Sequence, residues 1–213
     1  MVERGTFIAF EGGEGTGKST QARLLVAALA ERGFDVVATR EPGGTPGAEA
    51  IRTLLLAPPG DGWYPRAEAL LFAAARSDHV DRLILPALER GAWVISDRFV
   101  DSSRAYQGGA GGLGDETIVA LHQLGSGGVR PDCTVLVDVD AGTVSARLAQ
   151  RDGGDSDAIG GRDAAYHAQV AASFRALAQG DPGAFRVVDG NGTPEEVHSR
   201  VLQALGHMLE PAA

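Results

Sequence analysis

Residues 11–20, EGGEGTGKST, combine glycines, hydroxyl side chains and one lysine at a spacing suited to binding phosphates. Gly12, Gly17, Lys18 and Ser19 match G-x-x-x-x-G-K-[ST], with an apolar stretch before them and a helical pattern after them. Backbone N–H groups of such a loop point inward at the positive end of the helix dipole, so they can surround a nucleotide's phosphates. The pattern predicts an ATP or GTP site formed by Gly12, Gly13, Glu14, Gly15, Thr16, Gly17, Lys18, Ser19 and Thr20.

Lys18 is the only lysine of the chain, and the rest of its 19 basic residues are arginines. A bias toward arginine would leave a lysine only where arginine cannot replace it. The lysine ammonium is a compact charge with rotating donors, whereas the planar fork of arginine does not fit a phosphate cradle. We therefore expect Lys18 to contact the β and γ phosphates and Ser19 to bind Mg²⁺, while Thr20 packs below the loop. The plain alternative is a glycine-rich turn with a chance lysine.

Composition limits the partners of the chain. Its 213 residues, 44 % hydrophobic and 22 % charged, are typical of one globular domain. The net charge of -9 argues against a nucleic-acid or anionic-membrane surface, because both reward a basic face. The single cysteine, Cys133, cannot form an internal disulfide and is predicted to be a buried thiol. No apolar run approaches the roughly 20 residues of a membrane span, so we expect a cytoplasmic protein.

Short apolar runs alternate with amphipathic stretches, as strands and crossover helices do in a parallel sheet. Within each apolar run, polar residues scarcely alternate with apolar ones. Helices should therefore cover both faces of that sheet. The prediction is one three-layer α/β/α domain of the P-loop NTP hydrolase type, residues 1–213, with a mobile lid at about 147–163. Strands are predicted at 6–11, 36–40, 93–97, 134–138 and 185–189, and helices at 18–32, 48–56, 67–76, 80–90, 117–124, 143–151, 164–179 and after Thr193. A helix break is predicted at 77–78 and a flexible connector at 108–114.

A second anionic site is indicated where the strand at 93–97 ends. Asp97 and Arg98 follow apolar residues at the sheet edge that faces the ligand in such folds. Arg98 can clamp an acceptor phosphate, and Asp97 can hold Mg²⁺, its water or that arginine; a surface ion pair is the alternative. Arg40 and Glu41 end another strand in the same way. A GTP switch is excluded because its N-K-x-D motif needs a second lysine, which favours a small-molecule kinase.

Five segments, in order, resemble the motifs of the bacterial thymidylate kinase family: FIAFEGGEGTGKST, TREPGGTPGAEAIRTLLL, EALLFAAARSDHV, WVISDRFVDSSRAYQG and PDCTVLVDVD. The resemblance covers nearly the whole chain and is more selective than the phosphate loop alone. It implies phosphoryl transfer from ATP, with Mg²⁺, to dTMP as a step in dTTP synthesis. It also implies a homodimer formed through apolar helices such as residues 67–75, although an alanine-rich helix could equally belong to the core of a monomer.

The resemblance assigns a base-binding pair, in which Phe72 stacks on thymine and Arg76 binds its carbonyl. Four residues apart on a helix, a ring and a guanidinium can address one flat base, although Phe72 alone would be read as core. Tyr106 is implied to crowd the 2′ position, and Glu14 to orient the acceptor phosphate. The implied contacts of dTMP are Glu41, Arg52, Phe72, Arg76, Arg98, Ser102, Ser103, Tyr106 and Gln107.

The charge that covers the γ phosphate must come from the lid, because the loop insert GEGT carries no basic residue. The lid of the family usually has Asp-Arg where Asp157 and Ala158 stand, so either Arg151 or Arg162 takes over that charge or the match of this glycine-rich stretch is shifted by a few residues. The candidates are Arg147, Arg151 and Arg162, with Arg151 expected to be catalytic and Arg147 to contact ATP, unless they form only a solvated helix face. The rival hypotheses are a nucleoside monophosphate kinase for another base and a non-catalytic nucleotide-binding regulator, at which Ala158 hints.

Overall fold

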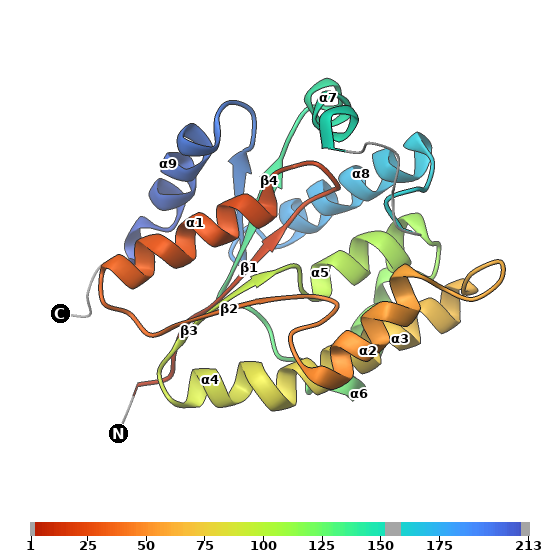
Figure 1. Cartoon of the computed structure of the whole chain (residues 1–213), viewed down its shortest axis with the longest axis horizontal. Helices are drawn as coiled ribbons and strands as arrows, with labels where there is room; N and C mark the ends of the chain where they lie inside the picture. Colours follow the sequence, from red (N-terminus) through yellow and green to blue (C-terminus); the bar gives the residue numbers. More distant parts are fainter. Residues whose placement is uncertain (1–2, 152–158, 210–213) are drawn as a thin grey trace.

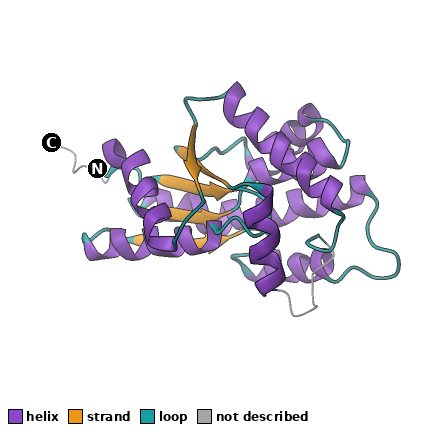
Figure 2. Ribbon diagram, turned by 90° about the horizontal axis from the view of Figure 1, so that it is seen from above, coloured by secondary structure: helices purple, strands orange, loops and turns teal. Residues whose placement is uncertain are grey.

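Five parallel strands form the central sheet, in the order β2-β3-β1-β4-β5. The structure is a computed structural model and describes residues 3–151 and 159–209. The predicted three-layer α/β/α fold with a five-stranded parallel sheet is confirmed, and the sheet and its covering helices are visible in Figures 1 and 2. The strands are β1 (Phe7–Glu11), β2 (Val36–Arg40), β3 (Trp93–Asp97), β4 (Cys133–Asp138) and β5 (Phe185–Asp189).

Helices cover the sheet on both sides, with α1 and α9 along one face and α4 on the opposite face (Figure 1). The long helices follow the predicted order, with bounds shifted by a few residues. The α-helices are α1 (Lys18–Glu31), α2 (Pro46–Leu56), α3 (Pro65–His79), α4 (Leu85–Glu89), α5 (Val100–Ser103), α6 (Asp115–Ser126), α7 (Ala141–Arg151), α8 (Ala164–Gly180) and α9 (Pro194–Ala204). Two π-helical stretches, η1 (Val80–Ile84) and η2 (Arg104–Ala110), and a 3₁₀ turn, η3 (Gly206–Met208), complete the described elements.

Strand β1 shows why the sheet is covered on both faces. Each of its residues is buried. Phe7 and Ala9 belong to the cluster with η1 and α4, whereas Ile8 and Phe10 belong to the cluster with α1 and α9. Alternate side chains of one strand point to opposite faces, so an uninterrupted apolar run requires a helix layer on each side.

The predicted helix break at 77–78 is wrong, because α3 continues through η1 into α4. Pro86 lies in the first turn of α4 and has no N–H to donate. The π-helical turn absorbs that defect, with the N–H of Leu85 bonded to the carbonyl of Val80. The proline therefore marks a change of helical pitch rather than an interruption.

The predicted flexible connector at 108–114 is wrong for its first three residues, which are helical, whereas 111–114 do connect η2 to α6. Gly108 and Gly109 belong to η2, and a Cβ on Gly109 would lie 2.2 Å from Ser173 Oγ of α8. Beyond them, the N–H of Gly114 is bonded to the carbonyl of Gly108 at 2.9 Å. The missing side chain of Gly109 allows η2 and α8 to approach closely. Glycines that serve close packing were therefore mistaken for a sign of mobility.

Two smaller predictions are confirmed. Thr193 caps α9 in a capping box with Glu196, and Cys133 is a buried free thiol. Asp157 and Ala158, on which the expectation for the lid depended, lie outside the described residues. Within residues 3–151 and 159–209, no helix combines the length and the apolar content that crossing a membrane requires.

Candidate active site

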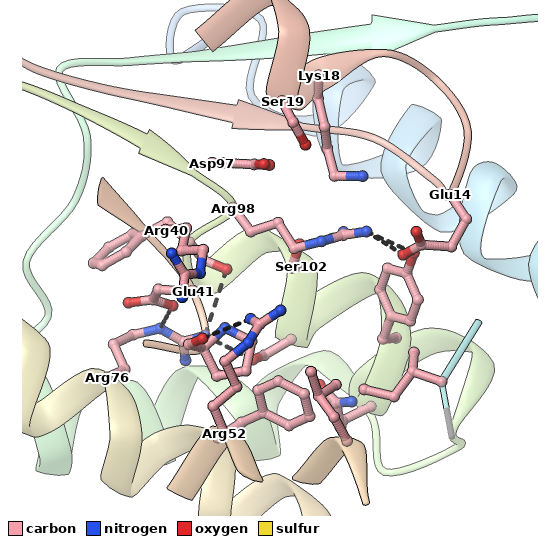
Figure 3. Close-up of a pocket in the computed structure, with 18 of the residues that line it drawn as sticks. Glu14, Lys18, Ser19, Arg40, Glu41, Arg52, Arg76, Asp97, Arg98 and Ser102 are labelled. Carbon is pink, nitrogen blue, oxygen red and sulfur yellow. Dashed lines mark hydrogen bonds and ion pairs between the residues drawn. The ribbon is translucent and has the colours of Figure 1, made fainter. Parts of the chain in front are cut away.

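A cavity of about 500 Å³ lies at the carboxyl edge of the sheet. Figure 3 shows Lys18, Ser19 and Asp97 at one end, hereafter the donor end, and Arg52 and Arg76 at the other, the acceptor end. The cavity is lined by every side chain predicted to surround dTMP: Glu41, Arg52, Phe72, Arg76, Arg98, Ser102, Ser103, Tyr106 and Gln107. Glu14, Lys18, Ser19 and Asp97 line it as well.

The P-loop, residues 12–19, depends on its glycines. Gly12 and Gly17 have positive φ angles of 146° and 91°, which side chains strongly disfavour. A Cβ on Gly12 would also lie 2.8 Å from the carbonyl oxygen of Val137. Lys18 is buried, and its Nζ donates to the carbonyl of Gly13 at 3.0 Å. Burial and the nearby Arg98 lower the pKa of Lys18, as expected for a cation held in place for an anionic ligand.

Arg98 connects the two ends of the cavity. Its backbone has a positive φ of 73°, an unusual conformation that turns the chain after β3. Nη1 donates to Gly12 O at 3.1 Å and to Ser102 Oγ at 3.0 Å, while Nη2 forms an ion pair with Glu14. Burial would lower the pKa of Arg98, but the nearby carboxylates of Glu14 and Asp97 reverse that effect and raise it. The guanidinium therefore remains charged between the P-loop and the acceptor end.

Tyr106 packs beneath this ion pair from η2. The Arg98 guanidinium carbon lies 5.1 Å from the centroid of the Tyr106 ring, and the Tyr106 hydroxyl lies 3.3 Å from Glu14 Oε1. Burial raises the pKa of the phenol, so Tyr106 stays neutral and its hydroxyl can donate to the Glu14 carboxylate. Glu14 and Tyr106, to which the resemblance gives separate roles at the acceptor phosphate and the sugar, are therefore in direct contact.

Asp97 and Ser19 offer oxygen atoms suited to Mg²⁺. Both line the cavity, and Figure 3 shows them near Lys18. Among the described residues, Asp97 Oδ1 is buried without a hydrogen-bond partner, which is costly unless a ligand satisfies it. The described residues contain no group of three or more acidic, histidine or cysteine side chains that could hold a metal ion. Ser19 and Asp97 together fit Mg²⁺, because this ion keeps several waters and binds through one or two protein oxygens plus phosphates.

Glu11 is a buried acid that the sequence analysis missed. Its Oε1 accepts from the N–H groups of Phe99 at 2.8 Å and Ser102 at 2.9 Å, and its Oε2 lies 2.6 Å from Ser102 Oγ. Burial and the nearby Asp101 raise the pKa of Glu11 to about 8. Glu11 thus holds the turn that contains Arg98. An acid at the end of a buried strand, the same signal that indicated Asp97, could have identified it.

Arg76 and Glu41 form a buried pair at the acceptor end. Arg76 Nε donates to Glu41 Oε2 at 2.7 Å, and Arg76 Nη2 donates to Ser103 Oγ at 2.8 Å. His79 Nδ1 lies 3.1 Å from Glu41 Oε1, and its Nε2 lies 2.7 Å from Thr39 Oγ1. Burial would raise the pKa of Glu41, but Arg76 and His79 lower it. Both carboxylate oxygens of Glu41 therefore support other protein side chains. The sequence analysis did not find His79.

Phe72 and Arg76, the pair that the family resemblance assigns to the base, both line the cavity from α3. Among the described residues, Nε and Nη2 of Arg76 are occupied by its bonds to Glu41, Ser103 and the carbonyl of Phe99. Nη1 is then the nitrogen available to a base carbonyl. Arg52 donates from Nη1 to the carbonyl of Pro42 at 2.8 Å, so both arginines are positioned by the segment after β2.

The candidate lid arginines occupy different places. Arg147 of α7 donates to the carbonyls of Thr16 at 3.2 Å and Gly190 at 3.0 Å, beside the P-loop. Arg162 forms an ion pair with Glu68 and a hydrogen bond with the hydroxyl of Tyr166, at the acceptor end. The backbone of Arg151 ends α7, and its side chain lies outside the described part of the chain.

Glu68 is a further residue that sequence reasoning missed. It accepts from Gln107 Nε2 at 2.8 Å as well as from Arg162. The motif EALLFAAAR begins with this residue. Its position one helical turn before Phe72 was a signal that it faces the same site.

Known proteins resemble this chain along nearly its full length. Residues 10–201 match the family model described as thymidylate kinase. The thymidylate kinase of Rhizorhabdus wittichii is 56 % identical over 205 residues, which cover 96 % of this chain and 99 % of that protein. The thymidylate kinase of Rhodopseudomonas palustris is 48 % identical over 98 % of this chain and 92 % of its own length.

The crystal structure of thymidylate kinase from Ehrlichia chaffeensis has the same fold, with a TM-score of 0.77 and 32 % sequence identity. The superposition covers 95 % of this chain and 99 % of that one. The resemblance in sequence motifs, the cavity with its P-loop, and the similarity to whole proteins and to a solved structure agree. The chain belongs to the thymidylate kinase family.

Proposed function

We propose that the protein transfers the γ-phosphoryl group of ATP to dTMP, with Mg²⁺, and so forms ADP and dTDP on the route to dTTP. Family membership supports the reaction. The observation that carries it for this chain is one cavity with a P-loop at one end and Phe72, Arg76 and Gln107 at the other, bridged by Arg98. Two phosphates can meet in such a cavity while a base is held away from the reacting atoms.

The donor end would bind ATP. Lys18 and the backbone N–H groups of the loop would neutralise the β and γ phosphates, and Arg147 would support the loop from α7. Ser19 and Asp97 would hold Mg²⁺, which when bound neutralises charge on the β- and γ-phosphate oxygens. The residues of the chain mainly align the two phosphates and exclude water.

The acceptor end would bind dTMP in line with the γ phosphate. An oxygen of the dTMP phosphate forms the new bond to phosphorus, and the bond to the bridging oxygen of ADP breaks. The acceptor is already an anionic oxygen, so no strong general base is required. Arg98 and Arg52 would bind the dTMP phosphate, with Arg98 exchanging part of its ion pair with Glu14 for the substrate.

The charge over the γ phosphate would come from Arg151. Arg151 is the arginine expected in this role from the sequence, while Arg147 contacts backbone carbonyls beside the P-loop and Arg162 pairs with Glu68. The lid would span about residues 147–163 of a single domain, residues 1–213.

We further propose that the protein is a cytoplasmic homodimer that does not bind nucleic acid. The net charge of -9 supports the last point. Large apolar side chains are exposed on α3 and α6, among them Leu70 at 56 % and Leu124 at 88 %. Helices α3 and α6 pack against each other, so these side chains can belong to one surface that a second copy covers. Light scattering after size exclusion would give the mass, and a monomer would contradict the dimer.

A coupled ADP-release assay tests the reaction. ATP and Mg²⁺ would be combined with dTMP, dUMP, dCMP, dGMP, UMP or CMP. We expect clear preference for dTMP. Preference for another base would support a different nucleoside monophosphate kinase, and no turnover with any of the six would support a non-catalytic regulator.

A further inference from the structure

Glu68 lies behind the cavity wall and links two residues of different segments. It belongs to α3 and is 8 % exposed. Its Oε1 accepts from Gln107 Nε2 at 2.8 Å, and its Oε2 forms an ion pair with Arg162. Gln107 lines the cavity together with Phe72 and Arg76, whereas Glu68 contacts the cavity through Gln107.

The pairing determines which end of the Gln107 amide faces Glu68. A carboxylate only accepts hydrogen bonds, and Glu68 forms its ion pair with the guanidinium of Arg162 as a carboxylate. The amide nitrogen of Gln107 must therefore be turned to Glu68, and the carbonyl oxygen Oε1 must be turned away from it. Gln107 is 3 % exposed, so bulk water cannot satisfy its amide in the flipped orientation. The side chain is fixed as an acceptor toward its other neighbours.

Pyrimidine bases differ at the atom that such an acceptor would read. Thymine and uracil carry an N3–H donor, whereas cytosine carries a lone pair at N3 and an amino group in place of the O4 carbonyl. An amide oxygen accepts from N3–H but faces the cytosine lone pair with a like partial charge. A buried site that makes a specific hydrogen bond rejects analogues that cannot make it far more strongly than an apolar pocket does.

We propose that Glu68 is a specificity-determining positioning residue: it fixes the amide of Gln107 as an acceptor, so that the site takes pyrimidine nucleotides with N3–H and rejects cytosine nucleotides. This inference rests on the proposed function, because it assumes that the base lies beside Phe72, Arg76 and Gln107. The Gln107 acceptor would be a second group that recognises the base, besides the donor that Arg76 presents to the base carbonyl.

The test is Glu68→Gln, which keeps the size of the side chain but can donate as well as accept. The amide of Gln107 could then turn over. We expect the ratio of kcat/KM for dTMP to that for dCMP to fall at least about tenfold. The ratio of kcat/KM for dTMP to that for dUMP should stay within about twofold of its wild-type value, because these two bases share N3–H and differ by one methyl group.

Arg162→Lys is the matched control. It keeps a positive charge beside Glu68 and removes the guanidinium, so the dTMP to dCMP ratio should match the wild type even if turnover falls. A uniform loss for dTMP, dUMP and dCMP in Glu68→Gln, or an unchanged dTMP to dCMP ratio, would overturn the proposal and leave Glu68 a structural residue.

Calorimetric binding of dTMP, dUMP and dCMP without ATP separates this inference from the proposed function. If the wild type binds dTMP over dCMP and Glu68→Gln does not, the inference holds whatever the turnover. If the wild type turns over dTMP and the variant keeps the wild-type preference in binding and turnover, only the inference fails. Absence of dTMP turnover in the wild type would count against the proposed function instead.

Discussion

At the donor end the binding groups are backbone N–H groups of a glycine loop and cations directed toward the cavity, whereas at the acceptor end charged side chains are paired with one another. Lys18 has only the carbonyl of Gly13 as its described hydrogen-bond partner, and its pKa is lowered by burial and by Arg98. Arg76, by contrast, is held through Nε and Nη2 by Glu41, Ser103 and a carbonyl, which leaves Nη1 for the base. The donor end therefore keeps its charge for a ligand, while the acceptor end uses its charge to fix the shape of a base site.

This difference predicts different consequences of mutation. At the donor end, removing a cation should lower the rate of phosphoryl transfer and leave the fold intact. At the acceptor end, removing one member of a buried pair should first destabilise the fold, because the remaining charge has no partner.

The largest effect on rate is expected for Lys18→Ala. Without the ammonium, charge on the β and γ phosphates is not neutralised, and kcat should fall by about 10³-fold or more. Binding of dTMP, measured by calorimetry, should be largely retained, and the midpoint of thermal unfolding should not fall. Loss of dTMP binding would show that the two ends are not separate sites.

Arg151→Ala should lower kcat by roughly the 10³-fold ascribed to an arginine that stabilises the transferring phosphoryl group. The KM for dTMP should change much less, because this arginine is assigned to the donor end. Steady-state kinetics with dTMP varied at saturating ATP would separate the change in kcat from the change in KM. A near-normal kcat would remove Arg151 from the mechanism.

Glu41→Gln tests the acceptor end. The substitution leaves the buried Arg76 guanidinium without its counter-ion, so the free energy of unfolding should fall by about 3–5 kcal/mol. Urea denaturation would measure it. Glu49→Gln is the control, since it breaks the exposed pair with Arg40 and should cost at most about 1 kcal/mol. Equal losses in the two variants would contradict the distinction between the ends.

Glu11 gives the smallest effect per pH unit, a slope of the free energy of unfolding with pH. In the unfolded chain its carboxyl ionises above its usual pKa of 4.5, but in the folded state only above about 8. Between these values the folded state binds the extra proton. The stabilisation is therefore complete below pH 4.5 and is lost as the pH rises to 8, by at most about 1.4 kcal/mol per pH unit.

Glu11→Gln should remove this slope in urea denaturation between pH 5 and 8. Its amide oxygen can accept from Phe99 and Ser102 as Oε1 does, and its nitrogen can donate to Ser102 Oγ. Glu116→Gln, at an exposed position on α6, should leave the slope unchanged. If the slope persists in Glu11→Gln, another group causes it.

The two ends also differ in what could be predicted from the sequence. The P-loop was predictable because its backbone conformation requires glycine at Gly12 and Gly17, so the constraint is written in residue types at fixed spacing. The strands were predictable for a similar reason, since a sheet covered on both faces needs continuous apolar runs.

The supporting residues of the acceptor end were not predictable in this way. Glu68 and Gln107 are 39 positions apart, and Glu41 and His79 are 38 apart. Such pairs arise only after α3, η2 and the segment following β2 pack together. Likewise, glycines in η2 could not be assigned to close helix packing until the position of Ser173 was known.

The single lysine has a practical consequence. Apart from the chain's N-terminus, the only primary amine of the protein is the ammonium group of Lys18, inside the phosphate site. Its lowered pKa increases the fraction of neutral, nucleophilic amine at a given pH. An amine-directed reagent small enough to enter the cavity would thus modify one side chain in the whole molecule, and the extent of that modification would report directly whether the P-loop is occupied.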